Sequence, residues 1–191
     1  SAVKFLAGSE AGYYRSLINA PAGIDVSVDG SELMLVGQAP QAWIDSIDRA
    51  FVPDERVRFV STDALRPVEL ISMRAYAHTI ESAVIAVDAL TKDALDAASD
   101  EILRLSQAMK PLVVDCQTLK RSCAVLVQGN SAASETDQTD GLWLAEQVSA
   151  ALRGQGVPFT LLKSVPGDAG VSGRADEAMH FVEFKVVDDS Q

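Results

Sequence analysis

Two cysteines and two histidines are the residues of this chain with the clearest capacity for catalysis or metal binding. Cys116 and Cys123 are separated by six residues, which is not a CxxC spacing, and no second pair of cysteines completes a zinc site. His78 and His180 each lack a metal-spaced partner, such as a histidine four positions further on. The sequence therefore predicts no metal site, and both histidines read as structural or exposed residues.

The sequence allows two redox states for the two cysteines. They are either reduced thiols in the core or in a loop, or a disulfide that closes a short loop in an oxidising compartment. A loop that small would add about 2 kcal/mol in the chain-entropy model. A Cys–His pair would need the fold to bring Cys123 beside a histidine, and nothing in the spacing indicates that.

No set of nucleophile, base and orienting residue is visible in the sequence, so we expect no enzyme and no cofactor. The stretch 167–173 carries three glycines, but Arg174 and acidic residues follow it rather than a helix. A phosphate cradle needs the start of a helix at that point. The range 166–176 is therefore predicted to be a mobile loop.

The charge balance bears on the class of partner. The chain has 27 acidic and 16 basic residues and a net charge of −11, which disfavours nucleic acid and anionic lipid surfaces. With 48% hydrophobic and 23% charged residues it has the composition of a globular protein. No apolar run approaches the roughly 18 residues of a membrane span, so a membrane would be reached only through a segment outside this chain.

Residues 1–66 are predicted to form a small α-β-β-α-β module. Asp29-Gly30 is a strong hairpin-turn signal between two alternating stretches. Trp43 falls on the inner side of an amphipathic helix and is predicted to be a core residue. The expected elements, in the order helix, strand, strand, helix, strand, cover 10–19, 24–28, 33–37, 41–51 and 57–61.

Residues 67–191 are predicted to form a second domain, because Pro67 marks a joint and helices then alternate with strands. Thr91 is a plausible N-cap, and Asp140 is placed as the cap of a helix that begins at Gly141. Gly129-Asn130 is expected to close a strand. The fold class is α+β with a mixed sheet; helices are expected at 68–79, 92–109 and 141–153, and strands at 83–87, 123–127, 159–165 and 179–187.

This second part resembles the OmpA-like family, which includes MotB-like and Pal-like peptidoglycan-associating domains. The resemblance rests on the run Val125-Leu-Val-Gln-Gly-Asn-Ser131, a polar loop, Leu144-Ala-Glu-Gln-Val148, Leu152 and Gly156-Val157. It covers roughly residues 68–188, and its landmarks appear in the family's order. It implies a βαβαββ sandwich with helices on one face of a mixed sheet, and it favours the Cys116–Cys123 disulfide.

The N-terminal part has a weaker resemblance to a BON-type or POTRA-like module. The residues that carry it run from Pro21-Ala-Gly-Ile24 through Asp29-Gly30 to Trp43-Ile44. In some envelope proteins such a module precedes an OmpA-like domain.

The sequence departs from the OmpA-like pattern where that family holds its ligand. The family binds the diaminopimelate end of a peptidoglycan stem peptide between an Asp and an Arg. The Asp carboxylate pairs with an amine of the ligand, and the Arg guanidinium makes a bidentate contact with a carboxylate of the ligand. Those positions fall here on Ala132 and Leu144, and the family's His falls on Asn130, which is followed by Ser131. The loop before the helix also looks about three residues shorter than the family's usual loop.

Two alternatives concern the same region. Asp137 or Asp140 would play the family's Asp in a shifted alignment, although an N-cap is the commoner role for Asp before an apolar-periodic run. Trp143 either packs against the adjacent loop or forms, with Leu142 and Leu144, an apolar patch for a protein partner.

Together these features predict a non-catalytic binding or scaffold module in the periplasm, part of a membrane-anchored protein of the bacterial envelope. A protein partner is expected in place of peptidoglycan. The alternative is diaminopimelate binding through a remodelled cleft that anchors an envelope complex to the cell wall. The outer membrane is the membrane expected for such a complex.

Overall fold

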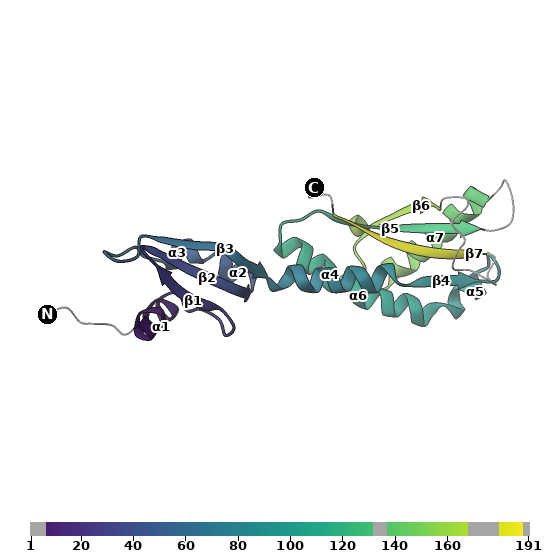
Figure 1. Cartoon of the computed structure of the whole chain (residues 1–191). Coiled ribbons are helices and arrows are strands. Elements are labelled where there is room, and N and C mark those ends of the chain that lie inside the picture. Colours follow the sequence, from purple (N-terminus) through teal and green to yellow (C-terminus); the bar gives the residue numbers. More distant parts are fainter. Residues whose placement is uncertain (1–6, 132–136, 168–179, 189–191) are drawn as a thin grey trace. The chain divides into compact units, whose positions relative to one another are not determined.

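The computed structural model describes residues 7–131, 137–167 and 180–188, with side chains from Glu10 onward and, after the first gap, from Thr139 onward. The chain divides into two compact units, the first ending at Ile71 and the second beginning at Ser72. Figure 1 gives the order of the elements along the chain. The division falls inside α4 (Val68–Glu81), a helix that begins directly after the last strand of the first unit.

The first unit has the predicted α-β-β-α-β order. Its elements are α1 (Ala7–Leu17), β1 (Asp25–Asp29), β2 (Glu32–Ala39), α2 (Gln41–Ile44), α3 (Ile47–Ala50) and β3 (Phe59–Pro67). The prediction of one helix over 41–51 is wrong, because the helix is interrupted between Ile44 and Ile47. The Ser46 hydroxyl donates to the carbonyl of Trp43 at 2.7 Å, and the Ser46 amide donates to the same oxygen at 3.0 Å. This local bonding replaces the regular helical ladder.

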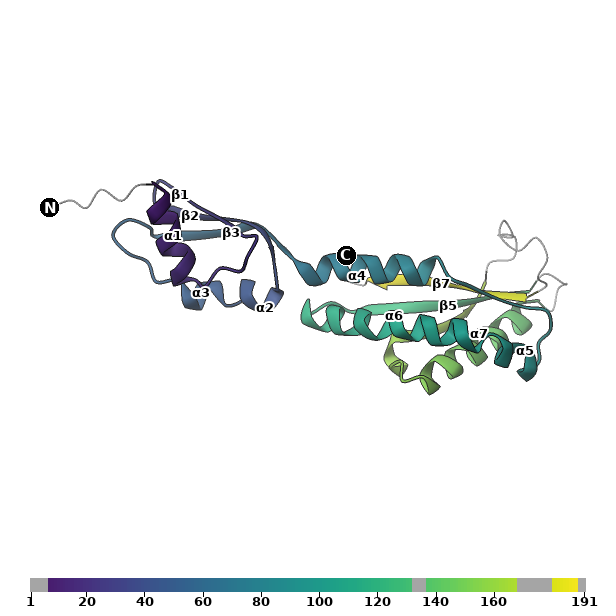
Figure 2. The same ribbon diagram turned by 90° about the horizontal axis from the view of Figure 1, so that it is seen from below.

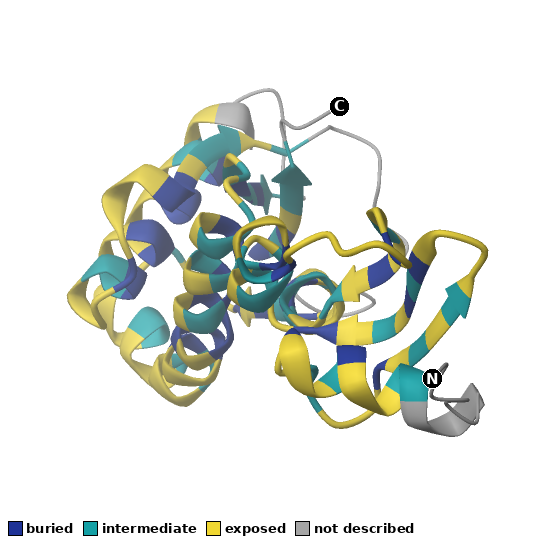
Figure 3. Ribbon diagram, turned by 90° about the vertical axis from the view of Figure 1, so that its left-hand side faces the viewer, coloured by how far each residue is buried: buried dark blue, intermediate teal, exposed yellow. Residues whose placement is uncertain are grey.

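The sheet of the first unit has the order β1-β2-β3, with β1 antiparallel and β3 parallel to β2. Buried residues alternate with half-buried or exposed ones in the first half of β2, so one face of the sheet carries the core. Figure 3 colours the ribbon by burial. Trp43 packs against that core, and its indole nitrogen donates to the carbonyl of Ile18 at 3.1 Å. The core consists of Tyr14, Ile18, Ile24, Leu33, Leu35, Ala39, Ile47, Phe51, Val57 and Leu65.

One polar contact ties α1 to the loop before β3. The hydroxyl of Tyr14, which is 3% exposed, donates to Asp54 Oδ2 at 2.7 Å. Burial, and then this bond, raise the pKa of Tyr14 to about 12. The amides of Val57 and Arg56 donate to Asp54 Oδ1 and, together with the Tyr14 hydroxyl, lower the pKa of Asp54.

The second unit contains the larger sheet. After α4 come β4 (Val84–Val87), α5 (Lys92–Ala97), α6 (Ser99–Thr118), β5 (Cys123–Ser131), α7 (Asp137–Gly154), a 3-10 turn η1 (Phe159–Leu161), β6 (Leu162–Pro166) and β7 (His180–Asp188). The strand order is β4-β7-β5-β6; β5 and β6 run parallel, and β7 runs antiparallel to both β4 and β5. The predicted fold class, α+β with a βαβαββ order and a mixed sheet, is confirmed.

Several predicted boundaries in this unit are wrong. The helix expected over 92–109 is two helices that meet at Ala98, and the second runs through Pro111 to Thr118. The strand expected from Phe159 begins with a 3-10 turn and pairs only from Leu162. The expected cap at Thr91 is present, since its hydroxyl accepts from the amide of Ala94 at 3.3 Å.

Helices α6 and α7 lie on one face of the second sheet (Figure 2). The side chains of α7 that face the sheet are completely buried against β5 and its neighbours. Most of the loop predicted over 166–176 lies outside the described residues. Among the helices of the described ranges, none has the length and apolar character needed to cross a membrane. The buried α7 residues are Leu144, Ala145, Val148, Ser149 and Leu152.

We predict that the stability of the first unit falls as the pH rises from 10 to about 12. The folded state favours the neutral phenol of Tyr14, whose pKa is raised from 10.0 to about 12, so this contribution is complete below pH 10 and is lost through pH 12. Thermal unfolding followed by circular dichroism across this range measures the effect. Tyr14→Phe should remove this component of the pH dependence, whereas Tyr13→Phe, at a side chain that is 56% exposed, should retain it. An unchanged profile in Tyr14→Phe would contradict the assignment.

Candidate functional site

Two of the predicted cleft residues, Asn130 and Ser131, lie at the end of the second sheet where β5 ends and β7 begins. The prediction that Gly129-Asn130 closes the strand is wrong, because β5 continues to Ser131. Asn130 pairs with Phe181, and Ser131 pairs with His180. Both candidates are therefore held by the ladder of a central strand rather than by a loop. Ala132, the neighbouring candidate, lies outside the described residues.

Successive residues of a strand face opposite sides of the sheet, which separates the two candidates. Ser131 shares its side with Val127, Val125 and the core under α7, while Asn130 faces the other side. Ser131 Oγ and His180 Nδ1 lie 2.9 Å apart, and the histidine is 8% exposed. The ring's tautomer decides which atom donates. No local sequence pattern indicates this pair, because 49 positions separate its members.

Three glycines make close approaches near the end of β5, two of them to each other's backbone and one to the side chain of Asn130. A Cβ on Gly141 would lie 2.2 Å from the carbonyl oxygen of Gly129, and a Cβ on Gly129 would lie 1.8 Å from the carbonyl oxygen of Gly141. Gly167 donates its amide to Gly129 at 2.8 Å, and a Cβ there would meet the Asn130 amide oxygen at 1.8 Å. The first turn of α7 thus lies directly on β5, at a separation that only glycine permits.

The start of α7 differs from the prediction. The helix begins at Asp137, so Asp140 lies within its first turn and is not the N-cap of a helix that starts at Gly141. A carboxylate in the first turn still interacts favourably with the helix dipole. The side chain of Asp140 is half-buried, and that of Asp137 lies outside the described residues.

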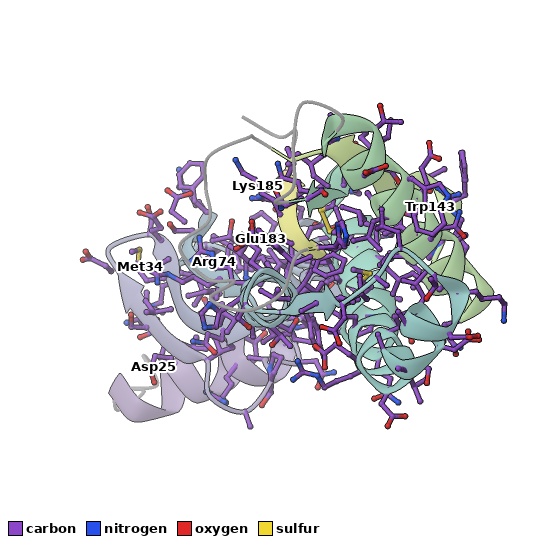
Figure 4. The ribbon with its side chains drawn as sticks, turned by 90° about the vertical axis from the view of Figure 1, so that its right-hand side faces the viewer. Asp25, Met34, Arg74, Trp143, Glu183 and Lys185 are labelled. Atoms are coloured by element: carbon purple, nitrogen blue, oxygen red, sulfur yellow. A yellow bond between two sulfur atoms is a disulfide. The ribbon has the colours of Figure 1, made fainter. Side chains whose placement is uncertain are left out.

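The predicted apolar patch on α7 is smaller than expected. Leu144 is completely buried, so its inclusion in an exposed patch over Leu142, Trp143 and Leu144 is wrong. Leu142 is half-buried and Trp143 is 37% exposed. Figure 4 shows Trp143 on the outer side of the green helix α7. Helical periodicity explains the difference, because adjacent residues point about 100° apart around the axis.

The two cysteines and His78 do not lie at the end of β5 where Ser131 pairs with His180. Cys116 and Cys123 form a disulfide, which links α6 to the first residue of β5. Cys123 stands eight residues from Ser131, about 26 Å along an extended strand, so it is not beside His180. His78 is exposed on α4. Across the described ranges, no group of three or more His, Cys, Asp or Glu side chains is arranged to hold a metal ion.

Arg153, the arginine of α7, contacts Phe159 and not the described residues of the predicted cleft. Its guanidinium carbon lies 4.6 Å from the centre of the Phe159 ring, a cation–π contact at the far end of the helix. Arg153 lies nine positions after Leu144, which corresponds to about 13 Å along the helix axis. Its guanidinium therefore does not occupy the place of the arginine that the OmpA-like pattern puts at position 144.

Comparisons with solved structures found likenesses to two envelope domains. The periplasmic domain of Helicobacter pylori MotB aligns over 56% of this chain and 72% of its own, with 16% identity and a TM-score of 0.44. The peptidoglycan-associated lipoprotein of Burkholderia pseudomallei aligns over 53% of this chain and 89% of its own, with 20% identity and a TM-score of 0.38. A comparison with protein-family models found no match, and neither did one with curated proteins. Because both TM-scores lie below 0.5, the functional proposal rests on this chain's own residues and topology.

We predict that Gly141→Ala destabilises the second unit by about 1–3 kcal/mol, the usual range for overpacking, because the new methyl group meets the Gly129 backbone. Gly154→Ala, at the end of the same helix, is the matched control, since no atom lies within 4 Å of a Cβ there. That variant should be neutral or stabilising by up to about 1 kcal/mol. Chemical denaturation measures both, and equal effects would contradict the close approach.

Proposed function

We propose that this chain is a non-catalytic binding and scaffold module of the bacterial periplasm, and that its ligand is a protein rather than peptidoglycan. In this proposal the first unit is a BON-type or POTRA-like module, the second an OmpA-like domain, and the boundary lies near residue 67. The chain would belong to a membrane-anchored envelope protein. The proposal combines the motif order in the sequence with the βαβαββ topology of the second unit.

The observation that carries the proposal is the burial of Leu144. The OmpA-like pattern places at this position an arginine that grips the carboxylate of the ligand, and such a grip needs an exposed guanidinium with several donors. Here the side chain is a leucine with 0% exposure, packed between α7 and the sheet. An apolar side chain in the core offers no hydrogen bond to a carboxylate. The second charge position of the pattern falls on Ala132, whose methyl group carries no charge either.

The outer side of α7 supports a protein partner. Trp143 is 37% exposed on this helix, and aromatic side chains anchor many protein interfaces. The site end of β5 is rigid, because Asn130 and Ser131 are fixed by strand pairing and α7 is fixed by the Gly129–Gly141 contact. A rigid frame with one exposed aromatic side chain suits recognition of a protein surface.

A photo-crosslinking residue at position 143 tests the partner. We expect it to form a discrete adduct with an envelope fraction, while the same residue at Lys163, exposed on β6, forms none. The two positions belong to one unit, so general stickiness would label both. Equal labelling, or none at position 143, would count against Trp143 as an anchor.

Co-sedimentation with purified sacculi tests the loss of the peptidoglycan grip. We expect no saturable binding at physiological salt and no effect of free diaminopimelate. Salt-resistant binding that diaminopimelate abolishes would overturn the proposal. If alanine at Asp137 and Asp140 removed such binding, the remodelled-cleft alternative would replace it.

A further inference from the structure

The disulfide closes the turn between α6 and β5. Cys116 lies in the last helical turn of α6, Cys123 is the first residue of β5, and seven positions separate them. The turn itself is a helix cap: the amide of Arg121 donates to the carbonyl of Cys116 at 2.8 Å, and Lys120 has a φ of 55°. The covalent bond and the cap therefore hold the same short stretch of chain.

Both cysteines line a cavity of about 210 Å³ on the surface of the second unit. The other lining groups include the polar side chains of Gln117, Arg121, Ser122 and Thr160. Val113 and Leu161 complete the lining, so the cavity wall is of mixed polarity. Both residues of the disulfide are therefore part of this wall.

The two sulfur-bearing residues are not equally accessible. Cys116 is 4% exposed beneath its helix, whereas Cys123 is half-buried at the strand end. Arg121 lines the cavity as well, and its guanidinium is paired with the carboxylate of Asp188. Because Cys123 is the more exposed of the two residues, its sulfur is the expected point of attack for an incoming thiolate.

We propose that Cys116–Cys123 is a thiol–disulfide exchange site that an external dithiol reaches in the folded protein. A thiolate of the dithiol attacks Sγ of Cys123 and forms a mixed disulfide. The Cys116–Cys123 bond breaks, its electron pair passes to Sγ of Cys116, and that thiolate takes a proton from water. The second thiolate of the dithiol then attacks its own partner sulfur and releases Cys123. The dithiol is oxidised to a disulfide, the protein is reduced by two electrons, and the reverse sequence inserts the bond.

The end of α6 is the segment that this exchange controls. Pro111 removes one hydrogen bond from the helical ladder, so the part of the helix that follows depends on its tertiary anchors. In the described residues these anchors include the buried side chain of Leu112, the bond from the Ser72 hydroxyl to Asp115 at 2.5 Å, and the disulfide. Reduction should loosen residues 116–122 while the sheet stays folded.

Reduction kinetics of the full chain in native buffer test the proposal, with dithiothreitol as the probe and maleimide trapping read by mass spectrometry. The rate should rise in proportion to the thiol concentration. Hydrogen exchange on the reduced protein should show faster exchange at 116–122 and unchanged protection in β5 and β7. A rate that reaches a plateau equal to the global unfolding rate would overturn the proposal, as would loss of protection throughout the unit.

Single-cysteine variants test the direction of attack. In Cys116→Ala the thiol of Cys123 remains, and in Cys123→Ala the thiol of Cys116 remains. With 5,5′-dithiobis(2-nitrobenzoate) in native buffer, we expect Cys123 to react at least about 10-fold faster than Cys116, because exposure governs thiol reactivity. If either variant fails to fold, oxidised glutathione mapping on partly reduced wild-type chain serves instead, with the adduct expected on Cys123. Equal rates, or an adduct on Cys116, would contradict the mechanism.

Discussion

The backbone contact between Gly129 and Gly141 determines how the second unit is put together. Because neither residue has a side chain, the first turn of α7 rests on the main chain of β5. This contact fixes the rotation of the helix about its axis. Leu144, Ala145 and Val148 then face the sheet and are completely buried, and Trp143 faces outward. A side chain at either glycine would push the helix away and open this core.

The same contact makes the proposed change of the cleft compatible with the fold. With this rotation of the helix, the side chain of Leu144 points into the core of the second unit. A leucine there adds apolar burial, which stabilises the unit, while a buried arginine without a paired anion would cost several kcal/mol. The Ser149–Ser164 hydrogen bond at 2.8 Å satisfies two further hydroxyl groups under α7. The proposed loss of the peptidoglycan grip is therefore compatible with a well-packed domain.

Strand β5 separates two regions for which different roles are proposed. One end carries Asn130, Ser131 and the Ser131–His180 pair, and the other carries the Cys116–Cys123 disulfide beside the Arg121–Asp188 ion pair. About 26 Å of strand lies between them. The proposed partner surface and the proposed exchange site are thus independent, and neither needs the other.

Local patterns predicted the elements, while tertiary contacts decided their ends. Periodicity identified the βαβαββ order and the Thr91 cap, because both depend on neighbouring residues. The periodic pattern predicts that this helix ends at residue 109, before Pro111. In the structure α6 continues past the proline, where Leu112 and Cys116 are buried. The Ser131–His180 pair and the Gly129–Gly141 contact left no local signal, since each joins separate elements. The disulfide was favoured only by a family resemblance, because spacing alone allowed reduced thiols.

The most direct measurement of the central claim is a nuclear magnetic resonance titration of the ¹⁵N-labelled chain with a soluble disaccharide peptide that carries diaminopimelate. The account predicts that the amides of Asn130 and Ser131 and the indole of Trp143 do not shift up to about 1 mM ligand, the range of weak binding. The indole of Trp43, in the first unit, provides an internal reference. Saturable shifts confined to Asn130, Ser131 and Trp143 would contradict the claim that this domain has lost its grip on peptidoglycan.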